Sequence, residues 1–257
     1  MENNRVPAVP EKLIDFFTAH PRLALAFSGG TDSAYLMYAA HACGADVRAY
    51  YVHAQFQPEF ERRDAERLSE ELGVPMTVLE RDVLAHPEIA ANPANRCYLC
   101  KRVIFDGILE AAAADGYKEI MDGTNASDDA GDRPGMRALK ELDVLSPLRL
   151  CGVTKAEVRA LSREAGLFTW NKPAYACLAT RVPTGTTITA EALQKAERAE
   201  EAVKALGFTD FRVRLLGNCA RLQVPRAQFL KAAEQADVIR AALEADFDAV
   251  LLDFKTR

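Results

Sequence analysis

The sequence has few of the features that would place the protein in a membrane or on nucleic acid. No apolar run approaches the roughly 18 residues that a membrane span needs, and the first residues lack the apolar core of a signal peptide. Lysine and arginine (32) do not outnumber aspartate and glutamate (37), and the net charge is −5. Because nucleic-acid binding relies on basic surface, we expect a cytoplasmic protein that binds neither membranes nor nucleic acid as its main partner.

Common nucleotide and metal patterns are also missing. No glycine loop ends in Gly-Lys-Ser or Gly-Lys-Thr, and the spaced glycines of a dinucleotide site do not occur. The pattern Cys-x-x-Cys occurs once, so no second pair completes the four thiolates usual for structural zinc. The 257 residues, 49% apolar and 27% charged, are typical of a soluble globular protein, with room for one large domain or for a main domain with a small appendage.

What the sequence does contain is an apolar stretch at 23–27 followed by Ser-Gly-Gly-Thr-Asp-Ser at 28–33 and then by helical spacing. This order predicts a buried strand, a tight turn and a helix. The first N–H groups of a helix lack internal acceptors and carry the positive end of its dipole, so the turn is suited to an anion such as pyrophosphate. The residues expected to contact the nucleotide here are Ser28, Gly29, Gly30, Thr31 and Ser33.

Asp32 lies inside this predicted phosphate site. A carboxylate beside phosphates costs energy unless a metal ion lies between them, so we assign Asp32 to magnesium as a hypothesis. The simpler alternative is an ordinary glycine turn capped by Thr31 or Asp32. The hexapeptide after an apolar strand resembles the loop of the PP-loop ATP pyrophosphatases, the adenine nucleotide alpha hydrolase-like superfamily. That resemblance implies cleavage of ATP to AMP and pyrophosphate while an oxygen of a carbonyl or carboxylate is adenylated.

Strand and helix patterns alternate through the first part of the chain. Helices are predicted at 11–20, 31–43, 58–72 and 103–114, and further strands at 47–52, 76–79 and 119–122, with a loop at 84–95. This alternation is typical of an α/β fold with a parallel sheet and helices on both faces. Ligands of such sheets lie beyond the carboxyl ends of the strands. Thr124, Asn125 and Asp128 follow the last of these strands, and we expect them to contact ribose, phosphate or metal, although a simple turn would use the same residue types.

The pattern changes near residue 186. A helix at 189–206, a hairpin of strands at 211–216 and 220–224, helices at 225–235 and 238–245 and a strand at 250–254 predict a small α+β unit. The expected domains are therefore 1–186, which holds the phosphate loop, and 187–257. We expect the second domain to bind substrate or to mediate homo-oligomerisation.

Three of the six cysteines are candidates for sulfur or metal chemistry. Cys97 and Cys100 form the Cys-x-x-Cys pair, and Cys177 lies in a long loop that carries lysine and arginine. Three cysteines with an open fourth position suit an iron–sulfur cluster that can hold an extra ligand such as sulfide, whereas a redox or structural pair is the alternative for Cys97 and Cys100. Cys43, Cys151 and Cys219 lie in ordinary segments, and we interpret them as structural.

Several motifs in order resemble the LarE sulfurtransferases of the PP-loop superfamily across nearly the whole chain. They are Ser28–Ser33, Arg96-Cys97-Tyr98-x-Cys100-Lys101, Asp122-Gly123-Thr124-Asn125-x-x-Asp128, Arg133-Pro134-Gly135 and Lys172-Pro173-x-x-x-Cys177-Leu178-Ala179-x-Arg181. The resemblance implies synthesis of the nickel-pincer nucleotide cofactor of lactate racemase. It implies ATP- and magnesium-dependent adenylation of the carboxylates of pyridinium-3,5-biscarboxylic acid mononucleotide, followed by thiolation. Adenylation suits this chemistry because a carboxylate is a poor electrophile until its oxygen can leave.

The resemblance also implies how sulfur and substrate are held. Some family members sacrifice the sulfur of one cysteine, here Cys177, while others hold a [4Fe-4S] cluster on three, here Cys97, Cys100 and Cys177. Because all three are present, we favour the cluster route, with the cellular sulfide donor unknown. The residues implied to bind the phosphate of the nucleotide-like substrate are Thr180, Arg181, Arg212 and Arg214. Alternation places Arg212 and Arg214 on one strand face, where they could grip one anion or lie solvated as exposed charges.

Other functions fit parts of the sequence. A tRNA thiolase can also join a phosphate loop to three cysteines, but the net acidity disfavours it. An amide-forming synthetase would use ammonia and would not need Cys177. A regulatory module could bind ATP without splitting it.

Overall fold

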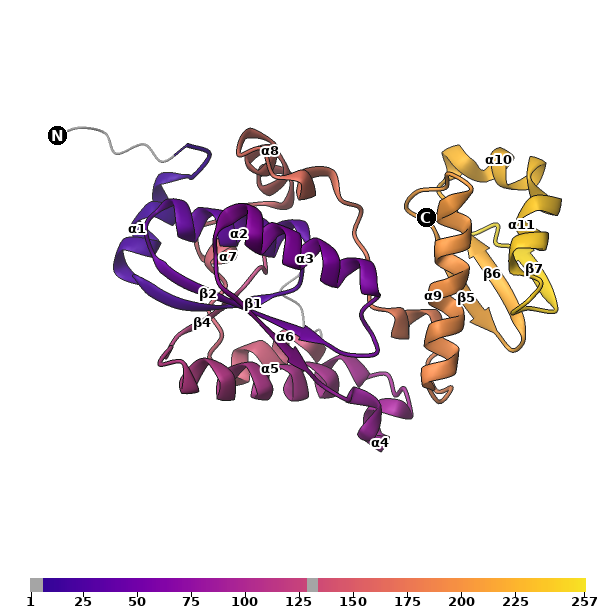
Figure 1. Ribbon diagram of the computed structural model, residues 1–257, viewed down its shortest axis with the longest axis horizontal. Helices are drawn as coiled ribbons and strands as arrows, with labels where there is room; N and C mark the ends of the chain where they lie inside the picture. The colour runs from indigo at the N-terminus through magenta and orange to yellow at the C-terminus, as the bar shows by residue number, and fades with distance from the viewer. Residues whose placement is uncertain (1–6, 129–133) are drawn as a thin grey trace. The chain divides into compact units, whose positions relative to one another are not determined.

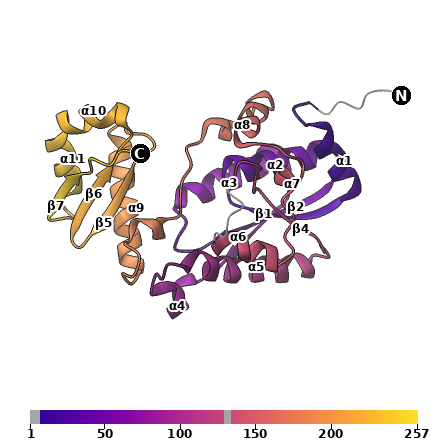
Figure 2. The same cartoon turned by 180° about the vertical axis from the view of Figure 1, so that it is seen from behind.

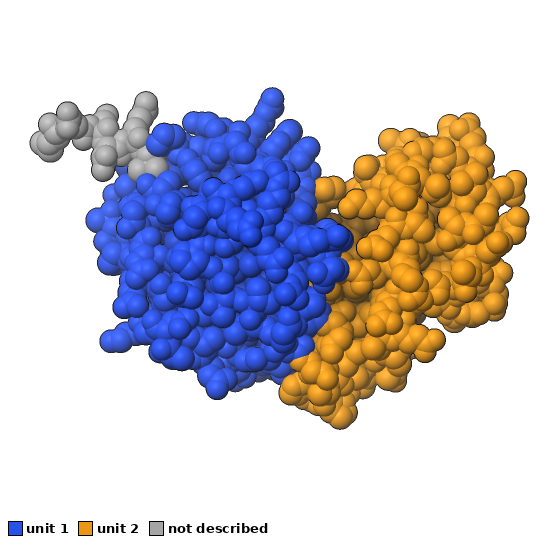
Figure 3. Space-filling view, viewed as in Figure 1, with its two compact units in different colours: residues 1–54, 59–81, 97–172 blue, residues 55–58, 82–96, 173–257 orange. Residues whose placement is uncertain are grey.

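The computed structural model describes residues 7–128 and 134–257. Of the motifs above, Arg133 therefore lies outside the described residues. The chain forms two compact units, drawn in two colours in Figure 3. Unit 1 comprises residues 1–54, 59–81 and 97–172, and unit 2 comprises residues 55–58, 82–96 and 173–257. The position near 186, where the sequence pattern changes, lies inside unit 2.

Unit 1 is built on a four-stranded parallel sheet with strand order β3-β2-β1-β4, as the alternating pattern predicts (Figure 1). Its strands are β1 (Arg22–Phe27), β2 (Asp46–His53), β3 (Met76–Glu80) and β4 (Ile120–Asp122). The central strand β1 is apolar on both sides because helices cover both faces of the sheet. Because β1 and β4 are parallel neighbours in the sheet, their carboxyl ends lie side by side, with Ala26 paired to Asp122.

Helices cover both faces of this sheet (Figures 1 and 2). Side chains of α1, α2, α3, α7 and α8 form the hydrophobic cluster on one face, and those of α5 and α6 form the cluster on the other. The bounds are α1 (Glu11–Ala19), α2 (Thr31–Ala42), α3 (Glu59–Leu72), α5 (Arg96–Ala114), α6 (Pro134–Glu141), α7 (Pro147–Leu150) and α8 (Lys155–Glu164), with a 3-10 helix η2 (Phe168–Asn171). The fold class predicted from the sequence is confirmed.

Two local predictions need correction. Helix α5 begins at Arg96 rather than at 103, so Cys97 and Cys100 lie within its first turns rather than in a loop. The segment 84–95, predicted as a loop, contains the short helix α4 (Pro87–Ala90) and overlaps the 3-10 helix η1 (Val83–Ala85). The side chain of Asp82 accepts hydrogen bonds from the N–H groups of Leu84 and Ala85 and so begins the first of these helices.

Unit 2 carries a three-stranded sheet of order β5-β6-β7. The strands β5 (Arg212–Leu216) and β6 (Cys219–Gln223) form the predicted antiparallel hairpin, and β7 (Ala249–Leu252) runs parallel to β6. The helices of this unit are α9 (Ala190–Ala205), α10 (Phe229–Glu234) and α11 (Ala236–Leu243), with the 3-10 helices η3 (Leu178–Arg181) and η4 (Arg226–Gln228). Buried Val213 and Leu215 alternate along β5 with Arg212 and Arg214, which share the opposite face as predicted.

In the described part of the chain, no helix has the length and apolar character needed to cross a bilayer.

Candidate functional site

The phosphate loop lies between β1 and α2, at the predicted strand-to-helix turn. Gly29 has φ +70°, a left-handed conformation that favours glycine, and a Cβ there would lie 3.2 Å from the Glu61 carbonyl oxygen. The Ser33 hydroxyl accepts from the Ser28 N–H at 3.3 Å and lies 3.0 Å from the Ser28 hydroxyl. Gly30 is the N-cap of α2 without a side-chain cap, so the N-terminal turn of this 12-residue helix can offer N–H groups to an anion.

The neighbouring strand packs directly against this turn through Gly123. A Cβ at Gly123 would lie 2.7 Å from the Ser33 nitrogen and 3.0 Å from its Cα. Both atoms belong to the backbone of α2, so no side chain can move aside to make room. The glycine in the motif Asp122-Gly123-Thr124 therefore allows the end of β4 to approach the first turn of α2.

Asp32 is held between two side chains from later parts of unit 1. The Lys155 Nζ lies 2.5 Å from its Oδ2, and the Asn125 amide donates to its Oδ1 at 3.2 Å. We did not predict Lys155 from the sequence. The sequence nevertheless contains a signal for a role of Lys155 outside its helix. Lys155 is the first residue of α8, where a positive charge opposes the helix dipole and does not stabilise the helix.

A second ammonium group lies at the loop. The Lys172 Nζ donates to the Gly29 carbonyl oxygen at 3.2 Å and forms an ion pair with Asp64 at 2.7 Å. Lys172 and Lys155 therefore place two cations around the phosphate loop, although the sequence has no lysine within the loop itself. Each is paired with an aspartate in the structure.

The polar segment after β4 forms a turn, and one of its side chains also reaches the phosphate loop. The Asn125 N–H donates to Asp128 at 2.9 Å, and the Ser127 N–H donates to the Asn125 side-chain oxygen at 2.8 Å. The Thr124 N–H and hydroxyl both donate to Asp122. Asn125 joins this turn to Asp32, whereas the side-chain contacts of Thr124 and Asp128 described here stay within the turn.

Cys97 and Cys100 are three residues apart on α5, so they lie on one helix face. The side chain of Tyr98, between them, contacts α6. Its hydroxyl donates to the Glu141 carboxylate at 2.7 Å, and the Arg137 guanidinium lies over its ring, 4.3 Å from the ring centroid. Within residues 7–128 and 134–257, no three histidine, cysteine or acidic side chains gather as a metal site. The third candidate, Cys177, belongs to unit 2.

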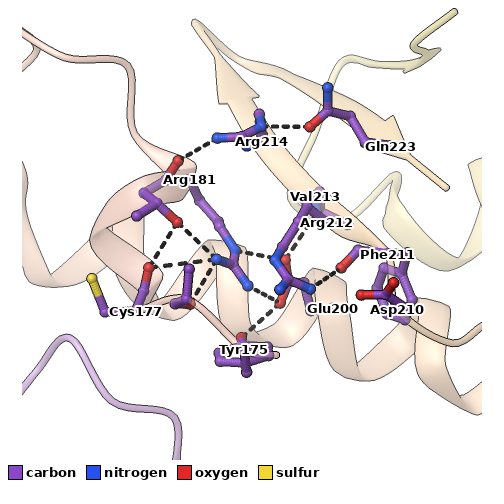
Figure 4. Close-up of polar contacts among 12 residues, drawn as sticks. Tyr175, Cys177, Arg181, Glu200, Asp210, Phe211, Arg212, Val213, Arg214 and Gln223 are labelled. Atoms are coloured by element: carbon purple, nitrogen blue, oxygen red, sulfur yellow. Dashed lines mark hydrogen bonds and ion pairs between the residues drawn. The ribbon is translucent and has the colours of Figure 1, made fainter. Parts of the chain in front are cut away.

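In unit 2, Arg181 and Glu200 organise the segment that contains Cys177 (Figure 4). The Arg181 Nε and Nη2 donate to the two Glu200 oxygens at 2.7 and 2.9 Å. The Arg181 Nη1 donates to the Ala176 carbonyl oxygen and to the Thr180 hydroxyl, both at 2.8 Å. Burial opposes the charged form of Arg181, but the bonds and charge of Glu200 outweigh it, so the pKa of Arg181 is raised.

Arg212 and Arg214 have a different environment (Figure 4). Arg212 donates to the Phe211 carbonyl oxygen at 2.6 Å and to the Ala174 carbonyl oxygen. Arg214 donates to the Gln223 side-chain oxygen and to the Thr180 carbonyl oxygen, both at 2.6 Å. None of these acceptors is a carboxylate. Burial, followed by the charge of Arg181, lowers the pKa of Arg212 to about 10 and lowers that of Arg214 as well. The guanidinium groups of Arg212 and Arg214 thus donate to neutral acceptors in these four hydrogen bonds, an environment that suits an anionic ligand.

Comparison with known proteins gives named relatives. An uncharacterised protein of Synechocystis, slr1717, is 36% identical over 95% of this chain and 93% of its own length. The pyridinium-3,5-bisthiocarboxylic acid mononucleotide synthase of Lactiplantibacillus plantarum is 33% identical over 80% of this chain and 76% of its own length. The tRNA-specific 2-thiouridylase MnmA of Thermobifida fusca is 30% identical over 59% of this chain and 51% of its own length. No family model matches the chain.

The parallel sheet and the glycine loop between β1 and α2, together with these relatives, define a PP-loop enzyme with the adenine nucleotide alpha hydrolase-like fold. More narrowly, the chain belongs to the LarE family and is an ATP-dependent sulfurtransferase.

Proposed function

We propose that this enzyme adenylates and then thiolates the two carboxylates of pyridinium-3,5-biscarboxylic acid mononucleotide, a step in making the nickel-pincer nucleotide of lactate racemase. The Lactiplantibacillus relative is named as synthase of the corresponding bisthiocarboxylic acid mononucleotide. The observation that carries the proposal is the pair Arg212 and Arg214, whose cationic groups have no carboxylate among the hydrogen-bond acceptors described above. A mononucleotide supplies the phosphate that such a pair binds.

Thr180 and Arg181 are proposed to take part in the same phosphate site. Thr180 supplies its carbonyl oxygen to Arg214 and its hydroxyl to Arg181, so it links the two guanidinium groups. Arg181 is only 1% exposed and donates to Glu200, so we assign it the role of holding the segment around Cys177 while Arg212 and Arg214 contact the phosphate.

The adenylation half of the reaction is assigned to unit 1. The loop residues Ser28, Gly29, Gly30, Thr31 and Ser33 would hold the departing pyrophosphate of ATP at the start of α2. Asp32 would hold Mg²⁺, which commonly takes one or two carboxylates and completes its coordination with phosphate oxygens and water. The ion neutralises charge on the phosphates, and Lys155 supplies a further cation beside Asp32. Thr124, Asn125 and Asp128 are proposed to contact the nucleotide or its metal.

For sulfur delivery we propose a [4Fe-4S] cluster held by Cys97, Cys100 and Cys177. The donor chemistry fits: Cys97 and Cys100 present two thiols on one helix face, and three cysteines leave one iron open for a sulfide. Such a cluster would supply the sulfur that replaces the adenylated oxygen.

The first experiment is to incubate the anaerobically purified enzyme with ATP, Mg²⁺, sulfide and the biscarboxylic acid mononucleotide. Mass spectrometry should detect the mono- and bisthiocarboxylates, together with AMP and pyrophosphate. Iron and acid-labile sulfide should each approach four per chain, as expected for a [4Fe-4S] cluster. Both should be lost in Cys97→Ala and Cys177→Ala but retained in Cys219→Ala, a matched control at a cysteine outside the proposed set.

Two alternatives have distinct outcomes in the same experiment. Thiolated product without any iron, together with a Cys177 peptide lighter by one hydrogen sulfide, would identify Cys177 as a sacrificial sulfur source. The 2-thiouridylase relatives favour tRNA as a second candidate substrate. Thiolation of tRNA but not of the mononucleotide would contradict our proposal.

We further propose that the enzyme is a homo-oligomer. In unit 2, Leu230, Val238 and Phe254 are 74%, 52% and 89% exposed, so these apolar side chains are accessible to a second copy of the chain. Light scattering during gel filtration would give the mass. A single 28.2 kDa species would contradict this proposal.

A further inference from the structure

Unit 2 contains a run of hydrogen bonds between two segments that each lead to a cysteine of the proposed sulfur site. One segment is 90–96, which ends immediately before Cys97, and the other is 179–188, which begins two residues after Cys177. Both segments belong to unit 2, so these contacts lie within one compact unit.

The hydrogen bonds follow an antiparallel order. The Ile188 N–H donates to the Ala90 carbonyl oxygen at 2.7 Å, and the Gly185 N–H donates to the Asn92 carbonyl oxygen at 2.8 Å. The Arg96 Nη1 then donates to the Ala179 carbonyl oxygen at 3.2 Å. As residue numbers rise along the first segment, those of their partners fall along the second. The run ends with Arg96, one peptide bond from Cys97.

Asn92 is the centre of this run. It is fully buried and has φ +55°, a left-handed conformation that asparagine tolerates better than most residues. Its side-chain amide donates to the carbonyl oxygens of Val182 and Pro183, the latter at 2.8 Å, and its side-chain oxygen accepts from Arg96. Both ends of the amide are therefore used to join the two segments.

Arg96 extends the connection to the cysteine-bearing segment. Its side chain is 8% exposed, and its Nη1 bonds both Asn92 and Ala179. Because neighbouring Cα atoms are about 3.8 Å apart, fixing Arg96 also fixes the chain position at which Cys97 begins. The contacts of Asn92 and Arg96 described here lie in unit 2, whereas the phosphate loop proposed for adenylation belongs to unit 1.

We propose that Asn92 and Arg96 are positioning residues that hold the segment leading to Cys97 against the segment that follows Cys177, so that sulfur can be delivered. This inference rests on the proposed use of these cysteines in sulfur transfer. It does not depend on whether the sulfur comes from a cluster or from Cys177 alone, because both routes need Cys177 to be held in a defined place.

The test uses two variants that remove the connection with little strain. Asn92→Gly deletes the amide and keeps a residue that adopts positive φ freely, and Arg96→Met keeps an unbranched side chain without donors. Arg96→Lys retains the charge, and Arg102→Met, on the same helix, is the matched control. Thermal unfolding and circular dichroism identify any variant that fails to fold. If Arg96→Met fails to fold, Arg96→Lys is used in its place.

The first readout is cross-linking of the full-length apoprotein with a short bifunctional thiol reagent, mapped by peptide mass spectrometry. We expect wild type and Arg102→Met to join Cys97 or Cys100 to Cys177. In Asn92→Gly and Arg96→Met, the yield of this cross-linked peptide should be about tenfold lower than in wild type. That factor corresponds to losing one hydrogen bond to a charged group. No such cross-link in wild type, or equal yields in all variants, would overturn the proposal.

The second readout separates positioning from general stability. In a single turnover, Asn92→Gly and Arg96→Met should release pyrophosphate from ATP at the normal rate when substrate is present, whereas the resulting adenylate should be converted to thiocarboxylate and AMP about tenfold more slowly. Equal loss of both products would indicate a merely structural role and overturn the proposal. A wild-type cross-link in a protein that never binds iron would support the positioning role and contradict the cluster.

Discussion

Arg181 and Glu200 form a buried, two-bonded ion pair between the Cys177 segment and α9. They are 1% and 6% exposed, and Glu200 also accepts from the Tyr175 hydroxyl at 2.6 Å and from the Val213 N–H at 2.9 Å. One carboxylate thus fastens the Cys177 segment, α9 and β5 to each other. A buried pair of this kind gives a defined geometry, because either charge is costly to leave without its partner.

Glu200→Gln should therefore destabilise unit 2 strongly. The amide keeps the shape of the side chain but leaves the Arg181 charge without compensation, and breaking a buried pair costs roughly 3–5 kcal/mol. Denaturation in urea would measure the loss. The matched control is Asp246→Asn, which breaks the exposed pair between Arg198 of the same helix and Asp246 and should cost less than about 1 kcal/mol. Equal costs for the two substitutions would contradict a structural role for Glu200.

The sequence predicted the sheet, the phosphate loop and the placement of Arg212 and Arg214 because each depends on a local pattern. The apolar stretch before Gly29 and the alternation along β5 are both visible within a few residues. The start of α5 at Arg96 is not marked by such a pattern, because Pro93 and Asn95, just before it, are residue types common in turns.

The roles of Glu200 and Lys155 could not be predicted in the same way. Glu200 lies in a helix rich in charged residues, where a glutamate is normally solvated, and its partner Arg181 belongs to another element. Lys155 contacts Asp32, which is 123 positions away in the chain. Such long-range charge pairs leave no periodic signal, because a single residue at each end is enough to form them.

Inorganic phosphate should stabilise the protein through Arg212 and Arg214. An anion bound between the two guanidinium groups offsets the burial, and the repulsion from Arg181 and Arg257, that lower their pKa values. We expect phosphate at 100 times its dissociation constant to add about 2.7 kcal/mol to the free energy of unfolding of the wild type. Arg212→Met with Arg214→Met should abolish the effect, whereas Arg226→Met, on η4 of the same unit, should retain it. A phosphate effect that survives the double substitution would place the anion elsewhere.

The lowered pKa of Arg212 also predicts a stability change at high pH. Its folded-state pKa of about 10 lies below the ordinary 12.5, so between these values the unfolded chain binds more protons than the folded chain. The contribution of Arg212 to the free energy of unfolding therefore rises with pH across this window. We expect the stability of the wild type relative to Arg212→Met to increase between about pH 9 and about pH 11, because tyrosine and lysine titrations cancel in the difference. A difference that is constant or falls would contradict the lowered pKa.

Lys155→Met should separate a role in charge neutralisation from a role in ATP cleavage. The Lys155 and Asp32 side chains are 33% and 24% exposed, so their pairing itself should contribute less than about 1 kcal/mol to stability. A cation that stabilises the departing pyrophosphate contributes more, because its interaction strengthens as charge develops on the leaving group. We therefore expect substrate-dependent pyrophosphate release to fall about tenfold to a hundredfold, the range for a lost hydrogen bond to a charged group.

The controls for this experiment test both members of the pair. Lys118→Met, at an exposed lysine of unit 1, should leave pyrophosphate release unchanged. Asp32→Asn should also slow release and weaken its dependence on Mg²⁺ concentration, because it removes the proposed metal ligand. If Lys155→Met released pyrophosphate normally while Asp32→Asn did not, Lys155 would serve only to neutralise Asp32. Normal release by Asp32→Asn would contradict the metal assignment, since a carboxylate without a metal ion opposes phosphate binding at this position.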